Sequence, residues 1–167
     1  MRNLVMVVFV EPVTEGGMFP REDWPLHITL LRFDLPSTAE DGSDPVRRLV
    51  EDATPAVCRA LGAQLRVGPE AWFGRHESIL VNLVEPDPRL QELHETIAGQ
   101  VLALHGRIAS QRHTLEAYRP HITHHDGRRR HAGQLLELDR VALVDMAPEG
   151  DHSQRRILKL WQGPPPA

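Results

Sequence analysis

Two short segments of this chain, one in each half, are nearly the same. The first reads WPLHITL (residues 24–30) and the second reads YRPHITH (residues 118–124), so a His-Ile-Thr motif occurs at positions 27–29 and again at 121–123. In a β-strand, alternate side chains point to the same face. Each motif is therefore predicted to present its histidine and threonine on one face of a sheet and to bury its isoleucine on the other.

The apolar pattern of the whole chain predicts an α+β fold. Apolar runs predict strands over residues 3–10, 26–33, 63–67, 78–84, 118–123, 138–146 and 155–161. Helical spacing predicts one helix from Pro45 to just before Gly62, and another from Pro88 to just before Gly106. Pro55 is expected to kink or split the first helix. Loops are expected over residues 11–25, 35–44, 68–77 and 124–131.

Length, charge and cysteine content narrow the class of protein. We expect a single domain over residues 1–161 and a Pro-rich tail over residues 162–167. The formal net charge of −4 argues against nucleic-acid binding through bulk positive charge. Cys58 is the only cysteine, which rules out an internal disulfide and favours a reducing, cytoplasmic location. The apolar run over residues 4–10 is too short to span a membrane and lacks a signal-cleavage site.

Two histidines and two threonines around one small volume suit phosphodiester chemistry without a metal. One imidazole must be neutral to take a proton from the nucleophile, and the other must be protonated to give one to the leaving oxygen. Histidine titrates near neutral pH, so both states are accessible together. The threonine hydroxyls can donate to the non-bridging phosphate oxygens, where charge builds in the transition state. The predicted catalytic residues are His27, Thr29, His121 and Thr123.

The paired motifs, their separation of 94 positions (27 to 121) and the chain length resemble the 2H phosphoesterase superfamily, in its bacterial 2′-5′ RNA ligase and 2′,3′-cyclic phosphodiesterase branch. The resemblance implies a bilobal fold with two pseudo-symmetric antiparallel sheets and flanking helices around a central cleft lined by the motifs. It implies action on 2′,3′-cyclic phosphate or 2′-5′ phosphodiester bonds of RNA or nucleotides, with no cofactor and no metal. It also implies that His121 is the base acting on water and that His27 is the acid.

Four further residues are candidates for binding RNA ends or small cyclic nucleotides. Trp24 and Tyr118 each lie three residues before a motif histidine and offer rings for stacking a base. Arg128 and Arg130 lie in the arginine-rich turn after the second motif, although family members often carry their arginine in a different register there. Charge near the histidines also bears on their roles. Arginines near His121 are expected to favour its neutral form, and Glu22 and Asp23 are expected to favour the protonated form of His27.

Two other functions remain open from the sequence. One is a module that binds RNA ends without turnover, although binding alone does not require a proton-transfer pair. The other is a zinc hydrolase built on His121, His124, His125 and His131; adjacent histidines in a strand face opposite ways, so this cluster is instead expected to be a solvated turn. His94 is expected to be a packed structural residue, and Cys58 and Trp72 are expected to be buried.

Overall fold

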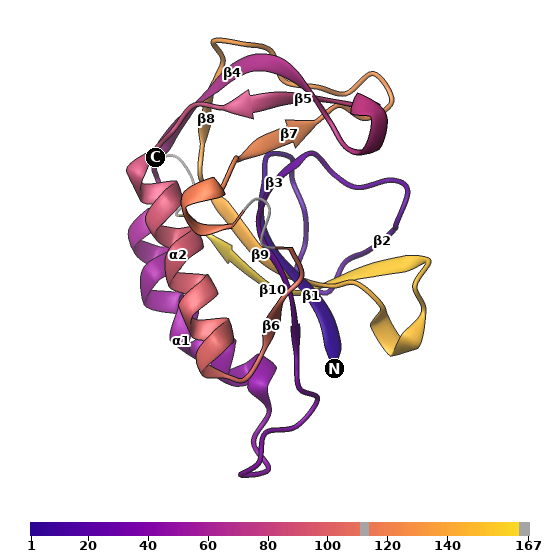
Figure 1. Cartoon of the computed structure of the whole chain (residues 1–167), viewed down its shortest axis with the longest axis vertical. Helices are drawn as coiled ribbons and strands as arrows, with labels where there is room; N and C mark the ends of the chain where they lie inside the picture. The colour runs from indigo at the N-terminus through magenta and orange to yellow at the C-terminus, as the bar shows by residue number, and fades with distance from the viewer. Residues whose placement is uncertain (111–113, 164–167) are drawn as a thin grey trace.

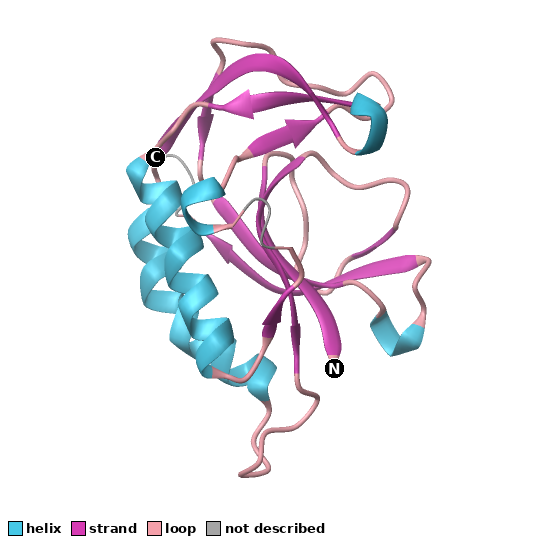
Figure 2. Cartoon of the chain, in the orientation of Figure 1, coloured by secondary structure: helices cyan, strands magenta, loops and turns pink. Residues whose placement is uncertain are grey.

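The computed structural model describes residues 1–110 and 114–163 and shows a curled antiparallel sheet with two helices on one side (Figures 1 and 2). The helices are α1 (Pro45–Ala60) and α2 (Pro88–Ala103). The strands are β1 (Arg2–Phe9), β2 (Met18–Pro20), β3 (His27–Leu35), β4 (Gln64–Phe73), β5 (Ile79–Val84), β6 (Arg107–Ile108), β7 (His121–Thr123), β8 (Leu135–Glu137), β9 (Arg140–Asp145) and β10 (Gln154–Gln162).

The strand order brings the two motifs to the middle of the sheet. The order is β2-β10-β9-β1-β3-β7-β5-β4-β8, with β6 beside β3. Strands β4, β5, β7 and β8 form the upper lobe in Figure 1, and the remaining strands form the lower one. The single pair Ile28 opposite Ile122 joins β3 to β7. The two predicted antiparallel halves are therefore parts of one continuous sheet, joined at the motifs.

The two helices begin at Pro45 and Pro88, as the sequence predicts. Asp44 accepts a hydrogen bond from the backbone N–H of Val46 at 2.9 Å, and Asp87 accepts one from the N–H of Arg89 at 2.8 Å. A proline follows each of these N-cap residues, where its missing N–H costs nothing. The helices pack against each other on the same side of the sheet (Figure 2). They bury the main apolar core, which includes both motif isoleucines.

A β-bulge in β3 decides which side chains share the face of the first motif. Val7 pairs with Thr29, and Val5 pairs with Arg32, so Leu30 is an extra residue in β3. Because of this extra residue, Arg32 lies on the same face as Thr29 although strand alternation alone would place it opposite. This face, away from the helices, holds a second apolar cluster around Phe9.

Several local expectations are corrected by the structure. Pro55 does not split α1: Thr54, beside it, donates its hydroxyl to the carbonyl of Val50 and accepts the indole N–H of Trp161, which ties the helix to β10. Strand β4 extends to Phe73, well into the expected loop 68–77, and the short strands β2, β6 and β8 were not predicted.

Burial also differs from expectation at two positions. Trp72 is 57% exposed and Cys58 is exposed, because both project away from the core from a strand and a helix surface. The division into a domain over residues 1–161 and a tail over 162–167 stays a prediction. Gln162 is the last residue of β10, and residues 164–167 of the predicted tail lie outside the described residues.

Candidate functional site

The four motif side chains meet at the junction of β3 and β7. Antiparallel pairing of Ile28 with Ile122 places His27 across from Thr123 and Thr29 across from His121 on the face opposite the buried isoleucines. His27 and Thr123 together line a cavity of about 230 Å³, and Thr29 and His121 together line an adjacent cavity of about 400 Å³. All four side chains remain partly exposed. Each of the two cavities is thus lined by the histidine of one motif and the threonine of the other.

Both imidazoles are oriented by the same kind of contact. Nδ1 of His27 lies 2.8 Å from the carbonyl oxygen of Pro25, and Nδ1 of His121 lies 2.9 Å from the carbonyl oxygen of Arg119. In each motif the acceptor is the residue two positions before the histidine. A carbonyl only accepts, so Nδ1 carries the proton of each neutral ring. Nε2 is then the nitrogen that gains or loses a proton during chemistry.

Each histidine also lies against an aromatic ring. The ring centroids of Trp24 and His27 are 4.6 Å apart, and those of Phe73 and His121 are 4.3 Å apart. The guanidinium of Arg119 lies 5.0 Å from the Phe73 ring. These rings fix the imidazoles from the side and reduce the water around them.

Most of the His27 ring is shielded from water although part of it stays exposed, and this loss of hydration lowers its pKa to about 4. The neighbouring His121 lowers this pKa further, while the Pro25 carbonyl and the Glu11 carboxylate oppose the shift. The sequence-based expectation that Glu22 and Asp23 would favour protonated His27 is therefore wrong. Loss of hydration outweighs nearby acidic charge, and the Asp23 carboxylate is bound by Arg128 at 3.0 Å.

Arg128 and Arg130 are held in contacts that connect the arginine-rich turn to the lower lobe. Arg128 donates to Glu11 at 2.7 Å and to Asp23, and Glu11 in turn accepts from the backbone N–H of Leu26 just before the first motif. Arg130 donates to the carbonyl of Val10 at 2.7 Å. In this structure Arg128 and Arg130, the two predicted phosphate ligands, hold the loop before His27 in place through these hydrogen bonds.

Tyr118 likewise has a structural partner on each side. Its hydroxyl donates to the carbonyl of Thr29 at 2.8 Å, and its ring stacks on His94 at 4.0 Å. His94 is buried as expected, with Nδ1 2.6 Å from the carbonyl of Leu30 and Nε2 accepting from the N–H of Leu115. Tyr118 thereby links the lead-in of the second motif to the strand of the first.

Asn82 is a buried polar residue behind the second motif that the sequence did not single out. Its amide donates to the carbonyl of Gly68 at 3.0 Å, and its oxygen lies 2.6 Å from Nε2 of His124. Because the amide oxygen only accepts, His124 carries its proton on Nε2. This pair anchors the chain directly after Thr123 to β4, near the point where the register of β4 against β5 shifts between Val67 and Glu70.

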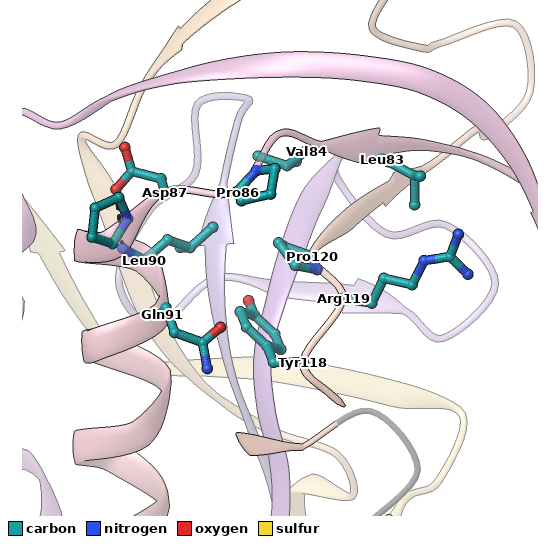
Figure 3. Close-up of a pocket in the computed structure, with 10 residues that line it drawn as sticks. Leu83, Val84, Pro86, Asp87, Leu90, Gln91, Tyr118, Arg119 and Pro120 are labelled. Carbon is teal, nitrogen blue, oxygen red and sulfur yellow. Dashed lines mark hydrogen bonds between the residues drawn. The ribbon is translucent and has the colours of Figure 1, made fainter. Parts of the chain in front are cut away.

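A third cavity, of about 390 Å³, lies beside the second motif between the start of α2 and residues 118–120 (Figure 3). Its walls are mostly apolar, with Leu83, Leu90 and Pro120 among them, and the side chain of Arg119 lies at one end. It shares Tyr118 and Arg119 with the cavity that holds Thr29 and His121. The site is therefore flanked by space for groups larger than a single phosphate.

Within residues 1–110 and 114–163, no three His, Cys, Asp or Glu side chains gather in a way that would hold a metal ion. His124 and His125 follow the end of β7 and contact different partners, Asn82 and Asp23. Neither helix in the described part of the chain is long and apolar enough to cross a bilayer.

Phe73 and Arg32 are site residues whose positions the sequence did not reveal. The contact of Phe73 with His121 depends on β4 continuing past residue 67, beyond its predicted end. Arg32 follows Thr29 by an odd number of residues, which predicts the opposite face unless a bulge intervenes. No sequence signal marks that bulge.

A curled antiparallel sheet with two His-x-Thr motifs on adjacent strands defines a 2H phosphoesterase, and comparison with known proteins supports this class. The family model described as the 2′-5′ RNA ligase superfamily matches residues 8–138. The chain belongs to this superfamily. No curated protein matches the chain by sequence.

Solved structures show the same fold at low sequence identity. A crystal structure of a phosphoesterase has a TM-score of 0.58 and 15% identity, covering 97% of this chain and 98% of that one. E. coli LigT complexed with NADP+ has a TM-score of 0.57 and 15% identity, with 96% of each chain covered. TT0787 of Thermus thermophilus has a TM-score of 0.52 and 19% identity, covering 96% of this chain and 97% of that one.

Proposed function

We propose that this protein is a metal-independent phosphoesterase that acts on 2′,3′-cyclic phosphate or 2′-5′ phosphodiester bonds of RNA or nucleotides. The observation that carries the proposal is the junction of β3 and β7. There, Ile28 pairs with Ile122, and each motif histidine is held through Nδ1 by a backbone carbonyl. Two oriented imidazoles can act as the base and the acid in an in-line displacement at phosphorus. Two hydroxyls on the same face can donate to the non-bridging oxygens.

For a cyclic phosphate, the reaction proceeds with one base and one acid. Nε2 of His121 takes a proton from water, and the water oxygen forms a bond to phosphorus. The bond from phosphorus to one ribose oxygen breaks, and Nε2–H of His27 gives its proton to that oxygen. Thr29 and Thr123 donate to the non-bridging oxygens, where negative charge increases. The products are an open nucleoside monophosphate and a pair of histidines whose charge states have been exchanged.

The acid role of His27 depends on substrate. Its pKa of about 4 makes it neutral in the ligand-free protein at neutral pH. A phosphate between the motifs places negative charge beside the ring, which favours the protonated form. Substrate binding and protonation of His27 are therefore coupled: the acid is charged only when there is a leaving group to protonate.

A nucleotide-like substrate fits the surroundings of the site. E. coli LigT, which shares the fold, was crystallised with NADP+, a nucleotide. In this chain, the cavity with His27 and Thr123 is also lined by Trp24, whose ring offers a surface for a base. We place this activity in the cytoplasm, because the only cysteine of the sequence suits a reducing compartment.

A substrate panel in the presence of a chelator tests the proposal. Nucleoside 2′,3′-cyclic phosphates and 2′-5′ oligonucleotides are incubated with the protein and with His27→Ala as the matched control. We expect product from at least one class, unaffected by chelation and lost in the variant. Tight binding of RNA ends with no product in any arm would instead support a binding module. Loss of activity on chelation, restored by zinc, would support a zinc hydrolase.

A substrate whose leaving group needs no protonation separates the two histidines. A nitrophenyl phosphodiester has such a leaving group. We expect His27→Ala to regain most of its lost rate on this substrate, while His121→Ala stays inactive, because only the acid becomes dispensable. The opposite pattern would exchange the two roles.

A further inference from the structure

A cationic cavity adjoins the reaction centre on the side of Thr29. The bulge at Leu30 places Arg32 on the same sheet face as His27 and Thr29. Arg32 and Arg119 both line the cavity of about 400 Å³ that also contains Thr29 and His121. Arg32 comes from the strand of the first motif and Arg119 from the segment before the second. One arginine from each lobe therefore borders the space next to the threonine–histidine pair.

These two arginines differ from the arginines of the turn after the second motif. Arg128 is paired with Glu11 and Asp23, and Arg129 is paired with Glu70 at 2.5 Å. Arg32 and Arg119 are exposed and form no ion pair with any residue in ranges 1–110 and 114–163. Positive charge beside this cavity is therefore not neutralised by carboxylates of the described chain.

A third arginine increases the positive potential near Arg32. Arg155 lies 5.9 Å from the ring of Trp24, and its Nη1 donates to the carbonyl of Met146. Burial lowers the pKa of Arg155, repulsion by Arg21 and Arg32 lowers it further, and the carboxylates of Asp145 and Glu22 oppose the shift. Arg32 and Arg119 border one cavity, and neither is ion-paired within the described chain; their guanidinium groups offer donors that suit a phosphate group.

We propose that Arg32 and Arg119 bind a second phosphate group of the substrate, next to the phosphodiester that reacts at the two motifs. This inference rests on the proposed function and narrows it. The preferred substrates are then nucleotides or oligonucleotides with at least two phosphates, and a nucleoside 2′,3′-cyclic phosphate with a free 5′-hydroxyl is a poor one. The arginines act on specificity, whereas the motif residues act on the reacting atoms.

Paired substrates that differ by one phosphate test this inference. We compare adenosine 2′,3′-cyclic phosphate with the same molecule carrying a 5′-phosphate, and with a dinucleotide ending in the cyclic phosphate. We expect kcat/KM of the wild-type protein to be at least roughly tenfold higher for the substrates with a second phosphate, the usual scale of one charge-assisted contact. Arg32→Gln and Arg119→Gln should each remove most of that preference, because they should lower kcat/KM for the substrates with a second phosphate more than for the 5′-hydroxyl substrate.

Arg59→Gln is the matched control, because Arg59 is an exposed arginine at the end of α1, on the helical side of the sheet. It removes the same charge and should keep the full preference. Equal kcat/KM for the paired substrates, or a preference that survives both cavity variants, would overturn the inference while leaving the proposed function intact.

Binding of reaction products separates this inference from the proposed function. Adenosine 2′-phosphate and adenosine 2′,5′-bisphosphate are titrated into the wild-type protein and the variants by calorimetry. We expect tighter binding of the bisphosphate, by at least roughly tenfold, and loss of that difference in Arg32→Gln. Absence of turnover with this binding difference present would contradict only the proposed function. Equal affinities for the two nucleotides would contradict the subsite itself.

Discussion

The coupling between anion binding and protonation of His27 can be measured without catalysis. Burial lowers the pKa of His27 to about 4 in the ligand-free protein. At pH 7 only about one ring in a thousand then carries a proton. A tetrahedral anion between the motifs brings opposite charge to the ring and removes part of this penalty. We predict that such an anion raises the pKa of His27 by at least about two units, at about 1.36 kcal/mol per unit.

Linkage then fixes how anion affinity depends on pH. Because the complex holds a proton that the free protein lacks, affinity should rise about tenfold per pH unit as pH falls between the two pKa values of His27. Inorganic sulfate is the probe, since it does not titrate in this range. The ring C–H resonance of His27, assigned by comparison with His27→Asn, reports its pKa with and without sulfate. Calorimetry reports the affinity.

Protein stability offers a second readout of the same pKa. Between about pH 6.5 and pH 4, the unfolded chain takes up a proton at His27 that the folded chain does not. The free energy of unfolding should therefore fall as pH falls through this window, by at most about 3 kcal/mol. His27→Asn should lose this contribution. A ligand-free pKa near 6.5, or a pKa that sulfate leaves unchanged, would refute the reasoning.

Three further outcomes follow from particular contacts. Either histidine-to-alanine change should lower kcat roughly a hundredfold or more. Thr29→Ala and Thr123→Ala should each lower kcat by less, because each substitution removes only one of several donors to the phosphate oxygens. Steady-state kinetics in which a threonine change costs as much as a histidine change would contradict this. Asn82→Leu should lower the free energy of unfolding by about 2 kcal/mol, because the Gly68 carbonyl and His124 lose their buried partner; an unchanged urea midpoint would contradict this. Trp72→Ser should change stability by less than about 0.5 kcal/mol, since the ring is 57% exposed, and a large loss would show that it packs.

The doubled motif made the centre of the fold readable from the sequence. Strand alternation alone predicts that His27 and Thr29 share a face and that Ile28 is buried, and the structure shows this arrangement. The starts of the two helices could be predicted for a similar reason, because an aspartate followed by a proline begins each of them. Such local signals act within a few residues, so they need no knowledge of what packs nearby.

The surroundings of the motifs were not readable, because they depend on contacts between distant residues. Arg32 shares the face of Thr29 only through the bulge at Leu30, which pairing with β1 reveals. Arg128 stays a predicted phosphate ligand, but its pairing with Glu11, more than a hundred residues earlier, could not be predicted from the sequence. The pKa of His27 was expected to follow the charges beside it in sequence, whereas burial in the folded protein sets it.

The pH dependence of single-turnover hydrolysis tests the two-histidine mechanism most directly. The wild-type protein, with a cyclic phosphate substrate and a chelator present, should give a bell-shaped profile, with one limb for the neutral base and one for the protonated acid. His27→Ala should lose the limb at which the rate falls as pH rises, and His121→Ala should lose the limb at which the rate falls as pH drops. A wild-type rate independent of pH, or an unchanged bell in either variant, would contradict catalysis by His27 and His121.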